Sequence, residues 1–135
     1  MKSSPLFSVV MPAYNAEGFV CDALDSVARQ TCVDYDVLVV DDGSIDGTYG
    51  RISLWAQNHP DVDVEIIRQV NKGIGAARNA GVKRARGVFA AFLDADDVWL
   101  EPKLECVAAQ LKQAPGWISC VMMSGFRRTK KTRRD

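Results

Sequence analysis

The sequence predicts an α/β domain in which a mainly parallel sheet is flanked by helices. Short apolar runs alternate along the chain with longer segments of helical periodicity, which is the pattern of consecutive βαβ units. The chain has 135 residues, of which 47% are hydrophobic and 25% are charged, as in an ordinary globular protein. We therefore expect one domain with its own core and little room for a second.

The first βαβ unit begins with a strand over about residues 7–11, which we expect Pro12 to end. A helix over about residues 17–30 follows, because apolar side chains recur there on one face. The second strand covers about residues 36–40 and completes the unit.

A second helix and a third strand follow in the middle of the chain. Residues 43–48 form a loop, and Asp46 or Thr48 is the expected cap of a helix that ends near Gln57. The third strand covers about residues 62–68.

The last predicted elements begin with a turn at residues 71–75 and a third helix that ends near Gly87, the expected C′ residue. The fourth strand covers residues 88–93, and Pro102 is the expected first residue of a helix that ends near Gln113. A turn at residues 114–116 and a fifth strand at 118–123 would follow.

The net charge of zero hides an asymmetry between the body of the chain and its C-terminal end. Residues 126–135 carry six basic side chains, whereas the remainder has 11 basic and 16 acidic residues. An acidic body argues against nucleic acid as a partner, because phosphate backbones are bound by clustered Lys and Arg.

The cysteines lack the spacing of a zinc site, so we expect buried free thiols in a reducing compartment. They are Cys21, Cys32, Cys106 and Cys120. The single histidine, His59, is expected in a solvated loop. No apolar run approaches the roughly 20 residues of a membrane span, and the N-terminus lacks a signal-peptide pattern. We therefore expect a cytoplasmic protein that is still able to work at a membrane surface.

Carboxylates follow two of the predicted strands, as Asp41-Asp42 and as the segment 94–97 (Asp-Ala-Asp-Asp). Ligands of open α/β sheets bind beyond the carboxyl ends of the strands, so both acidic ends should face one crevice. A divalent cation carrying a phosphorylated ligand would relieve their repulsion. Alternation along an extended chain would point Asp94 and Asp96 the same way.

Each acidic segment also has a purely structural interpretation. The first would be an Asp-Gly turn with local hydrogen bonds. The second would supply cap and first-turn acids to the helix after Pro102. The occurrence of both segments at strand ends favours the metal-bound nucleotide.

The segment Asn71–Asn79 is a glycine-rich entry to the third helix. Such an entry presents backbone N–H groups to an anion, and Lys72 and Arg78 add positive charge there. It does not fit a dinucleotide fingerprint, because Arg78 stands at the third glycine position. An ion pair between Arg78 and an acidic strand end is the structural alternative.

Aromatic side chains offer further candidates for the pocket. Tyr14 follows the first strand, where its ring would either stack on a base or pack against the first helix. Trp55, Trp99 and Trp117 are expected in the core, with Trp99 close enough to the acidic loop to line the pocket.

Four segments combine these candidates in a fixed order over residues 8–97. They are Ser8–Asn15 (SVVMPAYN), Val40–Thr48 (VDDGSIDGT), Asn71–Gly81 (NKGIGAARNAG) and Phe92–Asp97 (FLDADD). Together they closely resemble family 2 glycosyltransferases. The resemblance implies a Rossmann-like GT-A nucleotide-diphospho-sugar transferase fold. It also implies metal-dependent transfer of a sugar, usually with inversion, from a nucleoside diphosphate sugar to an acceptor hydroxyl.

The resemblance also implies roles for individual residues. Pro12, Tyr14 and Asn15 would line the nucleotide pocket, Asp41 would contact the base, and Arg78 would lie near the diphosphate. The nucleotide-sugar residues would be Pro12, Ala13, Tyr14, Asn15, Asp41, Asp42, Ser44, Lys72, Gly73, Arg78, Asp94, Ala95 and Asp96. The ligands of Mn²⁺ or Mg²⁺ would be Asp94, Asp96 and Asp97, and the expected donor is a UDP-sugar.

In that family, the catalytic base and the acceptor pocket come from a C-terminal half that is missing here. We expect residues 1–125 to be a truncated GT-A nucleotide-sugar-binding domain and residues 126–135 a basic tail. The catalytic base is therefore unknown. The alternative function is a non-catalytic nucleotide-sugar-binding fragment, completed by another chain.

Other interpretations concern the acidic loop, the tail and the partners. A haloacid-dehalogenase-type phosphatase would need the Asp-x-Asp strand first in the fold, whereas here it comes fourth. The basic tail is expected to be a solvated terminus, and contact with anionic lipid is its functional alternative. Further expected partners are a saccharide or lipid-linked acceptor and a second copy of the chain, joined through exposed sheet edges.

Overall fold

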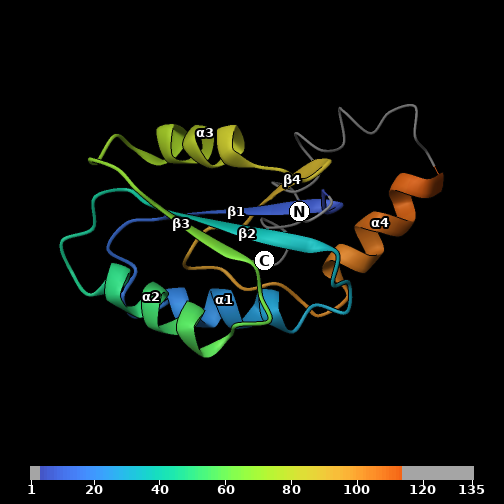
Figure 1. Ribbon diagram of the computed structural model, residues 1–135, viewed down its shortest axis with the longest axis horizontal. Helices are drawn as coiled ribbons and strands as arrows, with labels where there is room; N and C mark the ends of the chain where they lie inside the picture. Colours follow the sequence, from blue (N-terminus) through green and yellow to red (C-terminus); the bar gives the residue numbers. More distant parts are fainter. Residues whose placement is uncertain (1–3, 114–135) are drawn as a thin grey trace.

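The computed structural model describes residues 4–113 as a four-stranded sheet with helices on both faces (Figure 1). Every strand pair described is parallel, in the order β3-β2-β1-β4, so the predicted α/β fold is confirmed. In chain order the elements are β1 (Phe7–Ala13), α1 (Val20–Ala28), β2 (Tyr35–Asp41), α2 (Thr48–Asn58), β3 (Val64–Arg68), α3 (Ile74–Arg84), β4 (Phe89–Phe92) and α4 (Lys103–Gln113).

The chain changes its direction across the sheet after β3. Strands β1, β2 and β3 follow one another outward, with α1 and α2 on one face. Strand β4 then returns to the other side of β1, and the connecting helix α3 lies on the opposite face (Figure 1). The carboxyl ends of β1 and β4 thus form a topological switch point, which is where open α/β sheets bind ligands.

Both faces of β1 are buried. Phe7, Val9 and Met11 belong to the main core together with Leu24 of α1 and Ile52 of α2. These five side chains are among the fully buried residues, so the β1 face toward α1 and α2 carries much of the hydrophobic stabilisation.

Helix α3 approaches the other face of the sheet closely because it carries glycine at the contact. A Cβ atom added at Gly81 would lie 2.4 Å from Cγ1 of Val10 and 3.3 Å from Cγ2 of Val40. The second half of α3 therefore packs directly against β1 and β2.

A polar cluster connects the strands at their amino-terminal ends. Ser8 Oγ donates to Asp36 Oδ1 at 2.6 Å and accepts from the N–H of Gly87 at 2.8 Å. Arg86 donates to Asp36 at 3.2 Å and to Asp63 at 2.7 Å. These bonds connect β1, β2 and the segments that precede β3 and β4, on the edge opposite the switch point.

The prediction that Pro12 ends the first strand is wrong. Strand β1 continues through Pro12 and Ala13, which pair with Val40 and Asp41 of β2. The carbonyl of Val10 accepts from Leu93 on the β4 side, and Pro12, two residues later, faces the same side beyond the last β4 pair. The missing N–H of Pro12 therefore costs no sheet bond.

Gly87 is not the C′ residue of α3, which ends at Arg84 and is followed by the extended residue Ala85. Gly87 instead makes room for β1, because an added Cβ would lie 2.5 Å from the backbone N of Ser8. The other helix and strand positions agree with the sequence to within a few residues.

Several side chains lie differently from the expectation. Cys106 is exposed and Cys21 and Cys32 are half-buried, so the prediction of buried thiols is wrong, although all three are free. His59 follows the end of α2 as a half-buried residue, and its ring stacks on Trp55 with the ring centroids 3.8 Å apart. The predicted turn and strand at 114–123, with Trp117 and Cys120, and the basic tail all lie outside the described residues.

Within residues 4–113, no helix combines the length and the apolar character needed to cross a bilayer.

Candidate functional site

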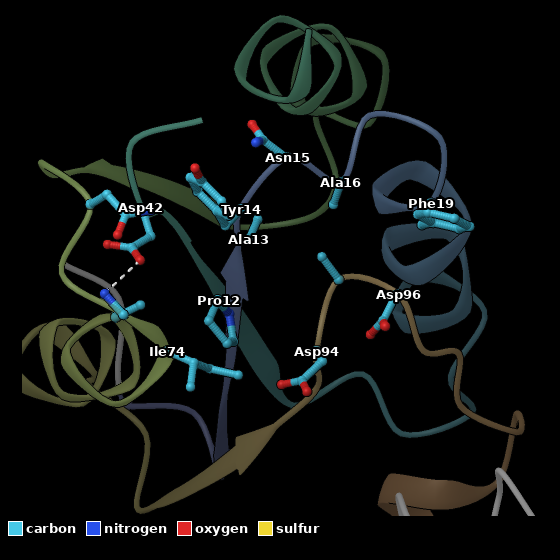
Figure 2. Close-up of a pocket in the computed structure, with 14 residues that line it drawn as sticks. Pro12, Ala13, Tyr14, Asn15, Ala16, Phe19, Asp42, Ile74, Asp94 and Asp96 are labelled. Carbon is cyan, nitrogen blue, oxygen red and sulfur yellow. Dashed lines mark hydrogen bonds between the residues drawn. The ribbon is translucent and has the colours of Figure 1, made fainter. Parts of the chain in front are cut away.

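A cavity of about 520 Å³ opens at the switch point (Figure 2). Its wall comes from the segment after β1, from Asp42 after β2, from the entry to α3 and from the acidic segment after β4. A cavity of this volume is in the range that binds nucleotides and other small ligands. The two acidic strand ends thus face one crevice, as the sequence predicts.

Three carboxylates after β4 lie close together. Asp94, Asp96 and Asp97 each offer one oxygen, and these oxygens lie within 4.8 Å of one another. Asp94 and Asp96 line the cavity, Asp96 being exposed and Asp94 half-buried (Figure 2). Hard oxygen ligands at this spacing fit the chemistry of Mg²⁺ or Mn²⁺, which complete their shells with water and phosphate oxygens.

Arg78 of α3 reaches this acidic cluster. Its Nη2 lies 3.2 Å from Asp94 Oδ1, and its guanidinium lies 6.0 Å from the centre of the Phe92 ring. The Nε atom of Arg78 is buried and has no hydrogen-bond partner within the described residues. Arg78 itself does not line the cavity, so its position matches the structural alternative of an ion pair.

Asp42 lies on the opposite side of the cavity from Asp96 and binds the entry to α3 (Figure 2). Its carboxylate accepts from the backbone N–H groups of Lys72 and Gly73, both at 2.9 Å, and from Gln69 Nε2 at 2.8 Å. Burial alone raises the pKa of Asp42, but these hydrogen bonds from Gln69, Lys72 and Gly73 lower it more, so the net shift is downward.

The contacts of Asp42 correct one expectation about the glycine-rich entry. The N–H groups of Lys72 and Gly73 are expected to receive an anionic ligand, yet an aspartate of the chain itself accepts their hydrogen bonds. Gly73 takes a positive φ of 98° at this point, which glycine adopts without strain. The segment is therefore an internally satisfied turn that shapes the cavity wall.

Asp41 is fully buried and does not line the cavity. Its Oδ1 accepts from the N–H of Ser44 at 3.1 Å, and its Oδ2 lies 3.4 Å from Arg68 Nε. Arg68 in turn lies 4.0 Å above the ring of Tyr49. Arg68 and the entry to α3 thus supply partners for Asp41 and Asp42 from within the chain, whereas a cation between the two acidic strand ends stays a prediction.

Most of the residues predicted from the sequence line the cavity, and a few lie behind its wall. Those in the lining are Pro12, Ala13, Tyr14, Asn15, Asp42, Gly73, Asp94, Ala95 and Asp96. Those outside it are Asp41, Ser44, Lys72, Arg78 and the predicted metal ligand Asp97. Trp99 is also outside the lining, because it is buried in the main core.

The sequence interpretation missed five lining residues, which are Ala16, Phe19, Asn71, Ile74 and Ala77. Phe19 and Ile74 are large apolar side chains that remain 58% and 51% exposed at the cavity. Both lie at the start of a helix, and a helix start beyond a parallel strand is the local signal that would have identified them.

Comparison with known proteins gives a consistent family assignment. Residues 8–135 match the family described as Glycosyl transferase family 2. Over 100 residues, 74% of this chain, the sequence is 38% identical to the Escherichia coli UDP-Glc:alpha-D-GlcNAc-diphosphoundecaprenol beta-1,3-glucosyltransferase WfgD. Over 93 residues, 69% of this chain, it is 39% identical to the uncharacterized glycosyltransferase EpsJ of Bacillus subtilis.

Solved structures show the same fold. The Staphylococcus aureus protein TarS, residues 1–349 in complex with UDP, superposes with a TM-score of 0.72 at 32% identity. That match covers 79% of this chain and 32% of the TarS chain. The mannosyltransferase PcManGT from Pyrobaculum calidifontis, in complex with GDP-Man and Mn²⁺, gives a TM-score of 0.67 at 31% identity. It covers 73% of this chain and 29% of the other.

The chain spans only part of the relatives that it matches. The aligned region is 38% of the length of WfgD and 26% of the length of EpsJ. The family match over residues 8–135 includes every residue that lines the cavity.

Proposed function

Because the chain belongs to glycosyltransferase family 2, we propose that its cavity binds a nucleoside diphosphate sugar together with a divalent cation. The expected donor is a UDP-sugar and the expected cation is Mn²⁺ or Mg²⁺. The observation that carries the proposal is the position of the oxygen cluster of Asp94, Asp96 and Asp97 beside a cavity at the switch point of the sheet.

The printed ligands of the structural relatives support this assignment. TarS is described with UDP and with UDP-GlcNAc, and PcManGT with GDP-Man and Mn²⁺. WfgD is described by its donor, UDP-Glc, and by a diphosphoundecaprenol acceptor. For this chain we accordingly propose a nucleotide-sugar donor and a saccharide or lipid-linked acceptor.

Each side of the cavity would have a different task. Tyr14, which is 49% exposed in the lining, would stack on the base, since an aromatic face binds a base without demanding charge. Asp94 and Asp96 would hold the cation, which when bound would neutralise the diphosphate leaving group. Arg78 would keep Asp94 oriented through their ion pair at the wall of the cavity.

We propose that the reaction proceeds with inversion, by direct attack of an acceptor hydroxyl on the anomeric carbon. That step needs a base to accept the hydroxyl proton. The described acids that follow Asp97 are Glu101 and Glu105, which are exposed and lie outside the cavity lining. The base therefore remains unassigned, and the described residues account for the donor side of the reaction.

A metal-dependence experiment tests the proposed function. Calorimetric titration with UDP in the presence of Mn²⁺ should give saturable binding that weakens at least about tenfold when the cation is removed with a chelator. The variant Asp96→Asn should lose most of the increase in UDP affinity that Mn²⁺ gives, because it removes a charged oxygen ligand. The control Asp22→Asn changes an exposed acid on α1 and should bind like the wild type. Equal UDP affinity with and without Mn²⁺ would contradict the proposal.

The alternative function is nucleotide-sugar binding without turnover. The two functions differ in one measurement. An enzyme releases UDP from a UDP-sugar in the presence of an acceptor, whereas a protein that only binds the donor leaves the UDP-sugar intact. Both alternatives require the donor site proposed here.

A further inference from the structure

Two loops at the carboxyl edge of the sheet are joined by reciprocal hydrogen bonds. The loop after β1 (residues 14–17) donates from the N–H of Asn15 to Ser44 Oγ at 2.9 Å and from that of Ala16 to Thr48 Oγ1 at 2.8 Å. The loop after β2 (residues 44–48) donates back from Ile45 N–H to Asn15 Oδ1 at 3.0 Å and from Gly47 N–H to Glu17 Oε1 at 3.1 Å. We call this set of bonds the loop latch.

Asn15 is the unusual member of the loop latch. It is the one non-glycine residue with positive φ, 47°, in the described part of the chain. Asparagine is enriched in this left-handed region, whereas most side chains avoid it. Because Ile45 presents an N–H donor, the Asn15 amide must turn its oxygen, and not its nitrogen, toward the second loop.

The loop latch extends from Asn15 to a buried carboxylate. Ser44 accepts from Asn15 through its hydroxyl, and its own N–H donates to Asp41 Oδ1. Tyr14, the exposed aromatic residue of the cavity, directly precedes Asn15. The path from Asn15 through Ser44 thus fixes the backbone beside the Tyr14 ring relative to the Asp41 carboxylate.

We infer that Asn15 is a positioning residue, which holds the backbone that carries the Tyr14 ring so that this ring can stack on a nucleobase in the cavity. The inference rests on the proposed function, because it concerns the base end of the same site. Asn15 lines the cavity, so a direct contact between its Nδ2 group and the ligand is the competing role. The two roles make opposite demands on the side chain: positioning needs the oxygen and the left-handed backbone, whereas a ligand contact needs the nitrogen.

Substitutions separate the two roles. Asn15→Asp keeps the acceptor oxygen and tolerates positive φ, but it removes the Nδ2 donor. Asn15→Gly keeps the backbone conformation and loses the acceptor, and Asn15→Ala loses the acceptor and strains the backbone. Asn79→Ala, an exposed asparagine on α3, is the matched control.

Calorimetry with UDP and with UMP, at about 150 mM salt, measures how each substitution changes the affinity for the nucleotide. Positioning predicts that Asn15→Asp binds within about threefold of the wild type, that Asn15→Gly is weaker, and that Asn15→Ala loses about tenfold or more. The loss should be the same factor for UDP and UMP, because the latch acts on the base end. Binding of Asn15→Asp that is as weak as that of Asn15→Ala, with both nucleotides, would overturn the inference.

Hydrogen exchange in the ligand-free protein tests the loop latch independently of the nucleotide. The amide of Ile45 should exchange at least about tenfold faster in Asn15→Ala and Asn15→Gly than in the wild type, and at nearly the wild-type rate in Asn15→Asp. Failure of the wild type to bind UDP would refute the proposed function. Wild-type binding together with undiminished binding by Asn15→Ala would instead refute the role of Asn15 and leave the proposed function intact.

Discussion

Arg78 and Asp94 connect α3 to the end of β4 by an ion pair of 3.2 Å, in which Asp94 is 15% and Arg78 23% exposed. The pair joins the two segments that flank the switch point. It also places a permanent positive charge beside the acidic cluster, so the three carboxylates tolerate one another before any cation arrives.

Removal of this guanidinium should lower the affinity for the ligand more than it lowers the stability of the fold. Arg78→Gln leaves Asp94 without its cationic partner, and we expect UDP affinity in Mn²⁺ to fall about tenfold or more. Arg84→Gln is the control on the same helix, because Arg84 pairs with Glu65 at an exposed position, where an ion pair contributes about 0–1 kcal/mol. Calorimetric titration compares the two variants, and an Arg78→Gln affinity equal to that of Arg84→Gln would contradict the assignment.

Asp42 should contribute mainly to stability. Asp42→Asn replaces one of the two acceptor oxygens by an amide NH₂ group. Because Gln69 and Lys72 donate to one oxygen and Gly73 to the other, at least one of these donors loses its acceptor. We expect the free energy of unfolding to fall by about 1–3 kcal/mol in urea denaturation. Asp34→Asn, at an exposed side chain near the amino end of β2, should change it by less than about 0.5 kcal/mol.

The same carboxylate predicts a pH dependence. Its pKa is lower in the folded protein than the ordinary 3.8, so its stabilising effect is fully present above pH 3.8 and is lost as the pH falls through the folded pKa. The difference in unfolding free energy between the wild type and Asp42→Asn should therefore be constant near neutrality and shrink below about pH 4. Urea denaturation at a series of pH values measures this difference in unfolding free energy. A difference that grows toward low pH would contradict the lowered pKa of Asp42.

Gly81 tests the close approach of α3 to the sheet. Gly81→Ala inserts a Cβ only 2.4 Å from the present position of Val10 Cγ1, which should destabilise the fold by about 1–3 kcal/mol despite the better helix propensity of alanine. Gly50→Ala, in α2, places its Cβ in open space and should stabilise by about 0.5–1 kcal/mol. Thermal unfolding of both variants should give shifts in opposite directions.

The parts of the fold that depend on hydrophobic pattern could be predicted from the sequence. Val37 to Val40 form a buried strand, and residues 20–28 form a helix with one apolar face, because burial alone determines both. The convergence of Asp42 and Asp96 on one cavity followed from the rule that parallel strands end at the same edge.

The remaining features depend on which neighbour a residue meets in space. Pro12 continues β1 because β4 stops two residues earlier, and the length of β4 is not visible at Pro12. Gly87 serves a close approach to Ser8 from the far end of the chain, which local turn rules misassign to a helix end. Lys72 and Gly73 look like anion donors until Asp42, thirty residues earlier, is found to accept their bonds.

The division into residues 1–125 and 126–135, the contact with lipid and the association of two chains remain predictions. The first and the second depend on residues beyond 113, where the structure describes nothing.

The polar cluster of Ser8, Asp36 and Arg86 joins the strands at the ends that lie away from the cavity. None of these three residues lines the cavity, so the bonds that support the sheet are separate from the residues that would contact a ligand. Amino-acid changes among residues 14–19 and 71–77 should therefore retune what is bound while the frame beneath them keeps its shape.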